Sequence, residues 1–262
     1  MRNLNSKYGQ HFLVNESVIA QIVQAAVSLK EESVVEIGPG KGALTLALIR
    51  AGLTRFTVSE IDPEMIDFLK RILPAQAGVR ILPGDFLETD LNTLPAVPTE
   101  FVSNLPYIDA ADILDKVLSF PYFRSAVFMF QKEQANRIQA KAGGAFYGPL
   151  SVLSQARASA SLLCNVSRGC FNPPPKVQSA VLVFKKLETP AVTDGQWPAF
   201  KKLVNAAFLH RRKTVYNSLL LAGHDKVRLQ NALTQAGIPA QFRPEQIDLP
   251  GYVRLAEALG GA

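Results

Sequence analysis

The segment SVVEIGPGKGALTLALIRAG, residues 33–52, constrains the fold more than any other part of the chain. It begins with an apolar run suited to a buried strand, passes through glycines at 38, 40 and 42, and continues as a helix-forming run that stops at Gly52. A buried strand followed by a tight glycine turn and a helix is the unit from which parallel sheets are built. The segment therefore predicts an α/β fold.

The same alternation continues through the first two thirds of the chain. Helices are predicted over 17–29, with Asn15 as its N-cap, and over 63–73, with Pro63 in the first turn. Further strands are predicted over 55–62, 79–82, 100–104 and 125–131. Two more strands, 160–167 and 177–186, have no helix-sized connection between them and predict an antiparallel pair at the end of a doubly wound sheet.

The pattern changes after a linker at residues 187–196, beyond which every periodic segment is helical. These helices are expected over 197–208, 214–222, 226–236 and 244–259. We therefore predict two domains, an α/β domain over 1–187 and a small helical domain over 188–262. Residues 189–262 hold 9 Lys and Arg against 5 Asp and Glu, so a large share of the net charge of +6 lies there. A basic helical domain favours a polyanionic partner such as RNA.

Composition excludes several classes of protein. Cys164 and Cys170 are too few for a disulfide framework or a zinc cluster, and no metal site is predicted. No apolar run approaches the roughly 18 residues of a membrane span. The first residues, MRNLNSKYGQHFL, lack the apolar core of a secretory signal. We expect a cytoplasmic protein that has no membrane partner and is a monomer.

Two acidic residues follow the strands that come after the glycine turn. Glu60 ends the next strand, where a carboxylate can accept hydrogen bonds from both hydroxyls of a ribose. Asp85 follows the third strand and suits the amino group of an adenine. Because the carboxyl ends of parallel strands share one edge, the glycines and both acids are expected together where α/β sheets bind ligands.

The glycine spacing indicates which ligand this edge takes. Gly38, Gly40 and Gly42 form Gly-x-Gly-x-Gly, which differs from the Gly-x-Gly-x-x-Gly of dinucleotide binders, and no basic residue accompanies Glu60. An adenosine-bearing ligand without phosphates fits best, so we predict S-adenosylmethionine as the cofactor. The structural alternative is a plain glycine turn followed by exposed acids at the strand ends.

The loop Asn104-Leu105-Pro106-Tyr107 follows the fourth strand and belongs to the same edge. An exocyclic amine of a nucleobase is a poor nucleophile, because its lone pair is delocalised into the ring. The amide oxygen of Asn104 and a backbone carbonyl held by Pro106 can accept its two N–H groups and aim the lone pair at a methyl donor. Tyr107 offers a face on which the base stacks. Alternatively, the loop is a rigid strand exit with a tyrosine filling the core.

Phe171 is the candidate for a second stacking aromatic. It lies at the tip of GCFNPPPKVQSA, a proline-stiffened loop between the last two strands of the sheet. From there its ring would close a sandwich around the base. A buried phenylalanine that anchors the loop is the other interpretation.

Together these motifs resemble the small-subunit ribosomal RNA adenine dimethyltransferases over nearly the whole chain. YGQHFLVN, EIGPGKGALT, EID, GDFL, NLPY, FNPPPKVQSAV, YGPLSVLSQ and FLHRRKTVYNSL follow the family's motifs in order. The resemblance implies a Rossmann-like class I S-adenosylmethionine-dependent methyltransferase sheet. It also carries over cofactor contacts to Gln10, His11, Leu13, Gly38, Gly40, Glu60, Ile61, Asp85, Phe86 and Asn104. The basic run before a predicted helix, with Arg211, Arg212 and Lys213, is expected to bind RNA phosphates; the alternative is a solvated helix start.

The activity implied by the resemblance is N6-dimethylation of two adjacent adenosines in a hairpin loop near the 3′ end of 16S ribosomal RNA, linked to small-subunit biogenesis. The sequence departs from the family after the Asn-Leu-Pro-Tyr motif, where Ile108 and Asp109 replace the usual Asn or Lys and Ile. Pro149 also stands where an Arg is common. These departures bear on the choice of target and the number of methyl groups added.

Three other functions are compatible with parts of the sequence. An erythromycin-resistance-type methyltransferase of 23S ribosomal RNA would share the glycine motif and the catalytic loop, although YGPLSV and RRKTVYNSL favour the small-subunit family. A non-catalytic RNA- or DNA-binding factor would have no use for the intact catalytic loop. An NAD-dependent oxidoreductase conflicts with the glycine spacing, and none of His11, His210 and His224 belongs to a proton-transfer constellation.

Overall fold

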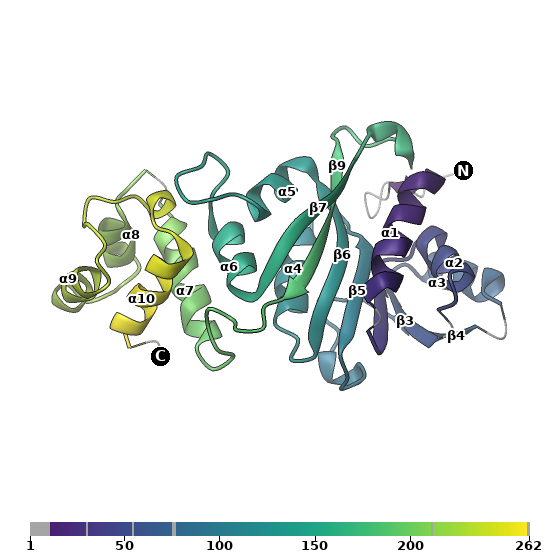
Figure 1. Ribbon diagram of the computed structural model, residues 1–262, viewed down its shortest axis with the longest axis horizontal. Helices are drawn as coiled ribbons and strands as arrows, with labels where there is room; N and C mark the ends of the chain where they lie inside the picture. Colours follow the sequence, from purple (N-terminus) through teal and green to yellow (C-terminus); the bar gives the residue numbers. More distant parts are fainter. Residues whose placement is uncertain (1–10, 30, 54, 75–76, 211, 261–262) are drawn as a thin grey trace. The chain divides into compact units, whose positions relative to one another are not determined.

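The computed structural model describes residues 11–29, 31–53, 55–74, 77–210 and 212–260 (Figure 1). Its contacts divide the chain into two compact units. The first, the sheet unit, holds the chain up to residue 135 together with 160–186. The second, the helical unit, holds 136–159 and the chain from 187 onward. The second crossing coincides with the predicted linker, whereas 136–159 joins the helical unit instead of the α/β domain in which the sequence pattern places it.

A seven-stranded mixed sheet forms the centre of the sheet unit, in the order β4-β3-β2-β5-β6-β9-β7. Its strands are β2 (Ser33–Ile37), β3 (Arg55–Glu60), β4 (Gly78–Pro83), β5 (Thr99–Asn104), β6 (Phe123–Gln131), β7 (Ala158–Val166) and β9 (Ser179–Lys186). The strands from β4 to β6 pair in parallel, and β9 runs antiparallel to β6. The predicted strands are all present, and the last two are neighbours at the end of the sheet.

The strand order brings the predicted ligand-binding residues to one edge. The chain passes from β2 outward to β3 and β4, then returns to place β5 on the other side of β2. The order therefore reverses between β2 and β5, at the point where open α/β sheets bind ligands. In the register, Ile37 lies opposite Ser59, Glu60 opposite Pro83, and Asn104 opposite Met129, so the carboxyl ends of these strands are level.

Helices pack on both faces of this sheet, as the alternating pattern predicts. They are α1 (Glu16–Leu29), α2 (Ala43–Arg50), α3 (Pro63–Ile72) and α4 (Ala110–Leu118), with α5 (Lys132–Ile138) following β6. Local signals set where they begin: the side chain of Asn15 accepts a hydrogen bond from the Val18 N–H at 3.0 Å, and that of Asp62 caps α3. Helices α1 and α2 bury Ile22 and Leu48 in one apolar core with Val102 of β5.

A second, two-stranded sheet was not predicted from the sequence. In it β1 (Phe12–Leu13) pairs antiparallel with β8 (Phe171–Asn172), so that Phe12 lies opposite Asn172 and Leu13 opposite Phe171. The Val14 N–H also donates to the Cys170 carbonyl at 2.9 Å. This pairing ties the start of the described chain to the proline-stiffened loop.

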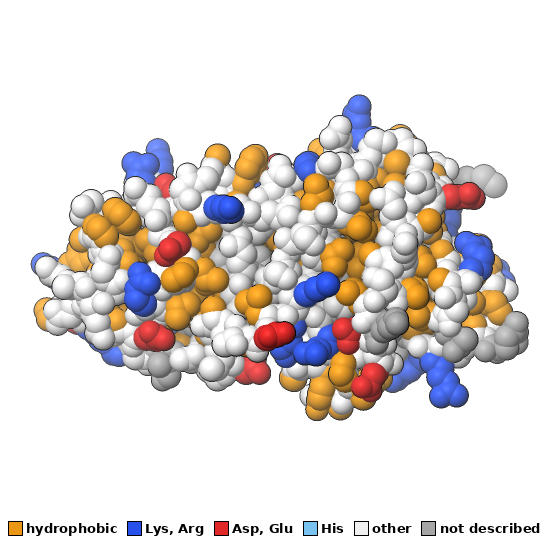
Figure 2. Space-filling view, viewed as in Figure 1, with side chains coloured by type: hydrophobic (Ala, Val, Ile, Leu, Met, Phe, Trp, Pro, Cys, Tyr) orange, Lys and Arg blue, Asp and Glu red, His pale blue; other side chains and the backbone are white. Residues whose placement is uncertain are grey.

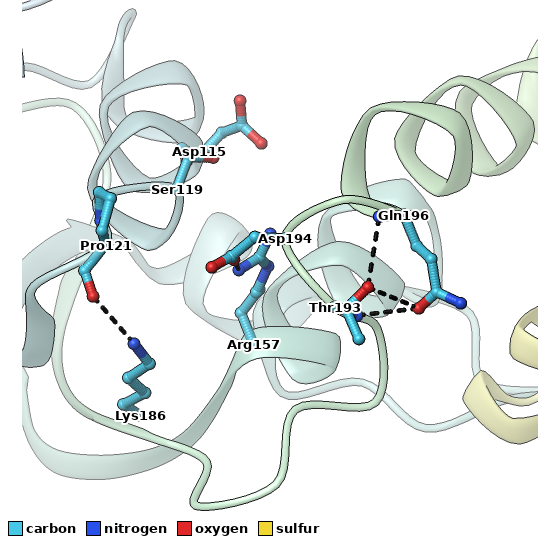
Figure 3. Close-up of polar contacts among 8 residues, drawn as sticks. All are labelled: Asp115, Ser119, Pro121, Arg157, Lys186, Thr193, Asp194 and Gln196. Atoms are coloured by element: carbon cyan, nitrogen blue, oxygen red, sulfur yellow. Dashed lines mark hydrogen bonds and ion pairs between the residues drawn. The ribbon is translucent and has the colours of Figure 1, made fainter. Parts of the chain in front are cut away.

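The helical unit contains α6 (Pro149–Arg157), α7 (Trp197–Phe208), α8 (Val215–Leu221), α9 (Lys226–Gln235) and α10 (Leu249–Ala258) around its own apolar core. Contacts of Arg157, at the end of α6, attach residues 136–159 to the helical unit. The Arg157 guanidinium lies 4.3 Å from the centre of the Trp197 ring and contacts Asp194 of the linker (Figure 3). Thr193 and Gln196 hydrogen-bond to each other in the same linker turn (Figure 3).

Candidate active site

A cavity of about 690 Å³ opens at the carboxyl edge of the sheet. All of its lining residues belong to the sheet unit. They come from the N-terminal segment, the ends of β2 to β6, the glycine turn with the start of α2, and the loop after β5 with the start of α4. The lining contains most of the residues predicted to bind the cofactor or act in catalysis: His11, Leu13, Gly38, Gly40, Glu60, Ile61, Asp85, Phe86, Asn104, Leu105, Pro106 and Tyr107. Gln10 lies outside the described residues.

Gly40 is required in the glycine turn for two separate reasons. Its φ of +53° lies in the left-handed region, which glycine occupies without steric cost. A Cβ at this position would also lie 2.9 Å from the Phe12 ring, which covers the turn. The Lys41 ammonium lies over the same ring, 4.5 Å from its centre. The turn and the N-terminal segment are therefore packed as one wall of the cavity.

Glu60 is held in place by the backbone around it. One carboxylate oxygen accepts from the Gly40 N–H at 2.9 Å, and the other accepts from the N–H groups of Ile61 and Asp62, both at 3.0 Å. Burial raises the pKa of Glu60, while these three hydrogen bonds oppose the increase. The side chain is thus oriented before any ligand arrives, and Oε2, which accepts a single hydrogen bond, retains a lone pair for a ribose hydroxyl.

The third strand end is organised by Asp85 and Phe86. Oδ1 of Asp85 accepts from the Leu87 N–H at 2.8 Å, which turns the loop back on itself. Phe86 is buried, and the Lys116 ammonium lies 5.7 Å from the centre of its ring. The same ammonium donates to the Leu87 carbonyl at 2.5 Å, so a side chain from α4 holds the loop in this shape.

Asn104 has a defined orientation in the catalytic loop. Its side-chain nitrogen Nδ2 donates to the backbone carbonyl of His11 at 3.0 Å. Because a carbonyl oxygen can only accept, this contact assigns the nitrogen to His11, and Oδ1 has no hydrogen-bond partner among the residues that the structure describes. The amide oxygen that the predicted chemistry needs is therefore available, and the N-terminal segment makes it so.

Tyr107 is fixed at both ends. Its hydroxyl lies 2.7 Å from the buried Ser179 hydroxyl of β9, and its backbone carbonyl accepts from the Gln134 side chain at 3.3 Å. Burial raises the pKa of the Tyr107 phenol, so the ring stays neutral. The ring centre of His11 is 5.9 Å away, and Nδ1 of His11 contacts the Pro173 carbonyl at 2.9 Å. These contacts fix the position of the Tyr107 ring beside that of His11.

Phe171 is placed differently from the prediction. Its side chain is only 3% exposed and packs in the apolar core beside Leu13, its partner in the two-stranded sheet. It is not among the described residues that line the cavity. The pairing of β8 with β1 explains this, because it turns the ring inward. In this structure the ring anchors the loop, and stacking on a base stays a prediction.

Glu36 is a cavity residue that the motif analysis missed. It is fully buried on β2, and the Thr45 hydroxyl donates to its carboxyl group at 2.7 Å. Burial, opposed by the Thr45 hydrogen bond and reinforced by Glu60, raises the pKa of Glu36 to about 8. The signal was present in the sequence, since an acid inside the apolar run SVVEIG needs a reason to be there.

The predicted RNA-binding residues lie between α7 and α8 of the helical unit. Arg212 and Lys213 are exposed, and the Lys213 N–H donates to the His210 carbonyl at 2.8 Å. Arg211 lies outside the described residues. On the face shown in Figure 2, Lys and Arg side chains are dispersed and form no single basic patch.

Two further observations concern the described residues as a whole. None of their helices combines the length and hydropathy that crossing a bilayer requires. Within the same residues, no group of three or more His, Cys, Asp or Glu side chains is arranged to hold a metal ion.

Comparison with known proteins places this geometry in a family. Residues 1–249 match the family model described as ribosomal RNA adenine dimethylase. The chain is 37% identical to a ribosomal RNA small subunit methyltransferase A of Pseudomonas syringae pv. tomato, over 97% of this chain and 93% of that protein. A protein of the same name from Clostridium botulinum is 34% identical over 97% of this chain and 94% of its own length.

Solved structures agree with these matches. A dimethyladenosine transferase from Plasmodium falciparum superposes with a TM-score of 0.78 at 26% identity, covering 95% of this chain and 98% of that one. The 23S rRNA methyltransferase ErmE superposes with a TM-score of 0.69 at 25% identity, covering 95% and 99%. The predicted fold class, the methyltransferase activity on ribosomal RNA and the cofactor S-adenosylmethionine are confirmed. The chain belongs to the ribosomal RNA adenine dimethylase family.

Proposed function

We propose that the protein transfers methyl groups from S-adenosylmethionine to N6 of two adjacent adenosines in a hairpin loop near the 3′ end of 16S ribosomal RNA. One observation carries this proposal. Asn104 lines the cavity with its Oδ1 free to accept, because its Nδ2 is bound to the His11 carbonyl. The same cavity contains Glu60 and the glycine turn, so acceptor and cofactor residues share one space.

The charges of the cavity fit S-adenosylmethionine. Four carboxyl groups line it: that of Glu36, which is largely protonated at neutral pH because burial raises its pKa to about 8, and those of Glu60, Asp85 and Asp109. Among the described lining residues Lys41 is the only lysine or arginine, and its ammonium lies over the Phe12 ring. Such a lining favours a ligand with positive charge and disfavours phosphates. S-adenosylmethionine has a sulfonium and an ammonium group, and when bound it supplies a methyl group on a positively charged sulfur.

Each cofactor-binding residue has a role that follows from its position. The Glu60 carboxylate accepts a hydrogen bond from the cofactor's ribose through Oε2, and Asp85 accepts one from the amino group of its adenine, with Ile61 and Phe86 beside the ring. Gly38 and Gly40 let the ligand approach the backbone. His11 and Leu13, with Gln10 next to them in the sequence, cover the cofactor from the N-terminal segment.

The catalytic loop acts on the target adenine by positioning it. Oδ1 of Asn104 and the Leu105 carbonyl, held by Pro106, accept the two N6–H bonds and direct the nitrogen lone pair at the methyl group. Tyr107, fixed by Ser179 and Gln134, stacks on the base. After transfer, the N6 ammonium is acidic enough to lose its proton to water, and the monomethylated amine, which retains one N–H, donates it to one of the two acceptors for the second transfer.

The choice of RNA is supported by the relatives. The curated relatives at 34% to 37% identity are named for the small subunit, whereas the ErmE structure is less similar than the dimethyladenosine transferase. An unpaired loop adenosine enters a cavity at less cost than one that must be flipped from a duplex. Arg211, Arg212 and Lys213 would bind RNA phosphates. The 16S substrate also implies a cytoplasmic location and a role in small-subunit assembly; we expect a monomer.

The test is methyl transfer to purified ribosomal subunits. Tritiated S-adenosylmethionine and the protein are incubated with small subunits that lack the modification, and in parallel with large subunits. The RNA is then digested and its nucleosides are separated. Asn104→Ala provides the control, with its affinity for S-adenosylmethionine measured by calorimetry to show that the cofactor site is intact.

We expect label in N6,N6-dimethyladenosine of the small-subunit RNA, and at least a hundredfold less with Asn104→Ala. Label in large-subunit RNA would replace the proposal with the erythromycin-resistance type of activity. Absence of label from both RNAs, together with measured cofactor binding, would refute catalysis and identify a binding factor on the same fold.

A further inference from the structure

Ile108 is the most exposed large apolar side chain among the described residues. It is 86% exposed, compared with 70% for Leu209 and 66% for Val227. It directly follows Tyr107, and the next residue that packs in the core is Ala110 at the start of α4. The fold therefore makes no use of the Ile108 side chain, which is exposed to water beside the catalytic loop.

The position of Ile108 gives this exposure a purpose. Ile108 lines the cavity, as does Val14, which is 52% exposed. Both are exposed aliphatic side chains on the lining of the cavity, and Ile61, which is 41% exposed, is a third. Single exposed hydrophobic residues are ordinary on protein surfaces, but one at the mouth of a binding cavity can lose its contact with water when the ligand arrives.

The acids around Ile108 indicate which part of an RNA it meets. Asp109 also lines the cavity, and Asp112 is exposed on the first turn of α4. Carboxylates repel the phosphate backbone, so this part of the rim does not bind phosphates. The flat face of an unpaired base is both apolar and uncharged, and it is the part of a nucleotide that an isoleucine covers well.

We propose that Ile108 is a positioning residue for the RNA: it packs against the face of the unpaired base adjacent to the target adenosine. This inference rests on the proposed function and deepens it. By covering the neighbouring base, Ile108 selects which adenosine enters the cavity. It also holds the RNA in place between the first and the second methyl transfer.

The first measurement is the kinetics of Ile108→Asn and Ile108→Ala on unmodified small subunits. We expect KM for the subunits to rise about tenfold, with affinity for S-adenosylmethionine unchanged, because a contact to RNA alone is lost. The ratio of N6-methyladenosine to N6,N6-dimethyladenosine should rise as well. Ile108→Leu, which keeps the apolar volume, should restore both values. Val227→Asn removes a comparably exposed aliphatic side chain from α9 and should change neither.

The second measurement tests the partner directly. Small subunits are reconstituted with RNA that has an abasic nucleotide on the 5′ or on the 3′ side of one of the two target adenosines, and methyl transfer is followed at that adenosine alone. If Ile108 covers that base, the kcat/KM of wild type should be about tenfold lower on one abasic substrate than on intact RNA. The kcat/KM of Ile108→Asn, already reduced on intact RNA, should fall little further on that substrate. Equal losses for the two proteins on both substrates would overturn the inference.

These outcomes separate the inference from the proposed function. Wild-type protein that methylates small-subunit RNA, together with Ile108 variants whose KM and product ratio are unchanged, would overturn only the role of Ile108. Wild-type protein that methylates neither ribosomal RNA would overturn the proposed function itself.

Discussion

At the scale of single residues, Glu100 shows how the fold controls protonation away from the active site. It lies on β5 between Val34 of β2 and Ser125 of β6, and it is fully buried. Among the described residues neither carboxyl oxygen has a hydrogen-bond partner. Burial, reinforced by Glu31, raises the pKa of Glu100 to about 9. The carboxyl group is therefore protonated in the folded protein at neutral pH.

This raised pKa predicts how stability depends on pH. Between the unfolded pKa of 4.5 and the folded pKa of about 9, the folded state binds a proton that the unfolded state has released. The stabilisation is therefore complete below about pH 4.5 and is lost as pH rises, by at most about 1.4 kcal/mol per pH unit from this group. Glu100→Gln, which cannot ionise, should remove this loss and be more stable than wild type above neutral pH.

Urea unfolding at several pH values between about 5 and 8.5 measures this effect. Glu257→Gln removes an exposed carboxylate from α10 and serves as the control, for which we expect the wild-type slope. A Glu100→Gln protein whose stability falls with pH as steeply as that of wild type would contradict the assignment.

Gly40 gives a second prediction at this scale, because another glycine shares its backbone conformation without its contact. Gly40 and Gly52 both have positive φ, but a Cβ at Gly40 would meet the Phe12 ring, whereas a Cβ at Gly52 would have nothing within 4 Å. Both alanine variants should lose about 1 kcal/mol of stability from backbone strain. Gly40→Ala should in addition bind S-adenosylmethionine about tenfold more weakly, as measured by calorimetry. Equal affinities in the two variants would show that Phe12 does not shape the cofactor site.

At the scale of elements, the link between the catalytic loop and β9 is open to test. The Ser179 hydroxyl at the start of β9 is the hydrogen-bond partner of the Tyr107 hydroxyl. Ser179→Ala should lower kcat about tenfold while cofactor affinity stays unchanged, because the stacking ring loses its anchor. The control is Ser125→Ala, which removes another buried hydroxyl, near the start of β6 and away from the catalytic loop. It should leave kcat unchanged. A Ser179→Ala enzyme with wild-type kcat would show that the link is not needed.

How far the elements could be predicted depended on how local their signals are. Some features depend only on residues next to one another in the sequence: the Asn15 cap, the glycine turn and the acid at the end of β3. The structure places each of them where the sequence pattern indicates. The pairing of β1 with β8 has no such signal, since two-residue strands have no periodicity and join residues 12 and 172. That pairing accompanies the burial of Phe171 and brings the His11 carbonyl to Asn104, so the loop's composition alone could not decide between the two environments considered for the phenylalanine.

At the scale of the whole molecule, the division into units shows the same limit. The linker near residue 187 was recognisable because its composition differs from that of its surroundings. The earlier crossing near 136 was not, because it falls within α5, where the sequence pattern does not change. What assigns them to the helical unit are long-range contacts, such as Arg157 over the Trp197 ring and the Leu187 N–H donating to the Arg157 carbonyl at 3.1 Å. Contacts of this kind depend on the finished fold.

The helical unit's role in binding RNA leads to the last prediction. Arg212 and Lys213 are exposed next to α8, where two positive charges can neutralise phosphates without reading a base. The double variant Arg212→Ala, Lys213→Ala should bind small-subunit RNA more weakly, whatever the RNA sequence. The slope of log binding constant against log salt concentration should decrease in magnitude by about 1.4 if each residue neutralises one phosphate of an unpaired strand. Affinity for S-adenosylmethionine should not change.

The matched control removes the same two charges elsewhere on the helical unit. Lys226 and Arg243 are also exposed, so Lys226→Ala, Arg243→Ala tests net charge alone. Electrophoretic mobility shifts at a series of salt concentrations separate the two cases. A specific phosphate contact reduces the slope only in the Arg212, Lys213 variant, because counterions are released only where phosphates are neutralised. If both double variants lose slope equally, the whole basic surface attracts RNA, and the segment before α8 has no special part in holding it.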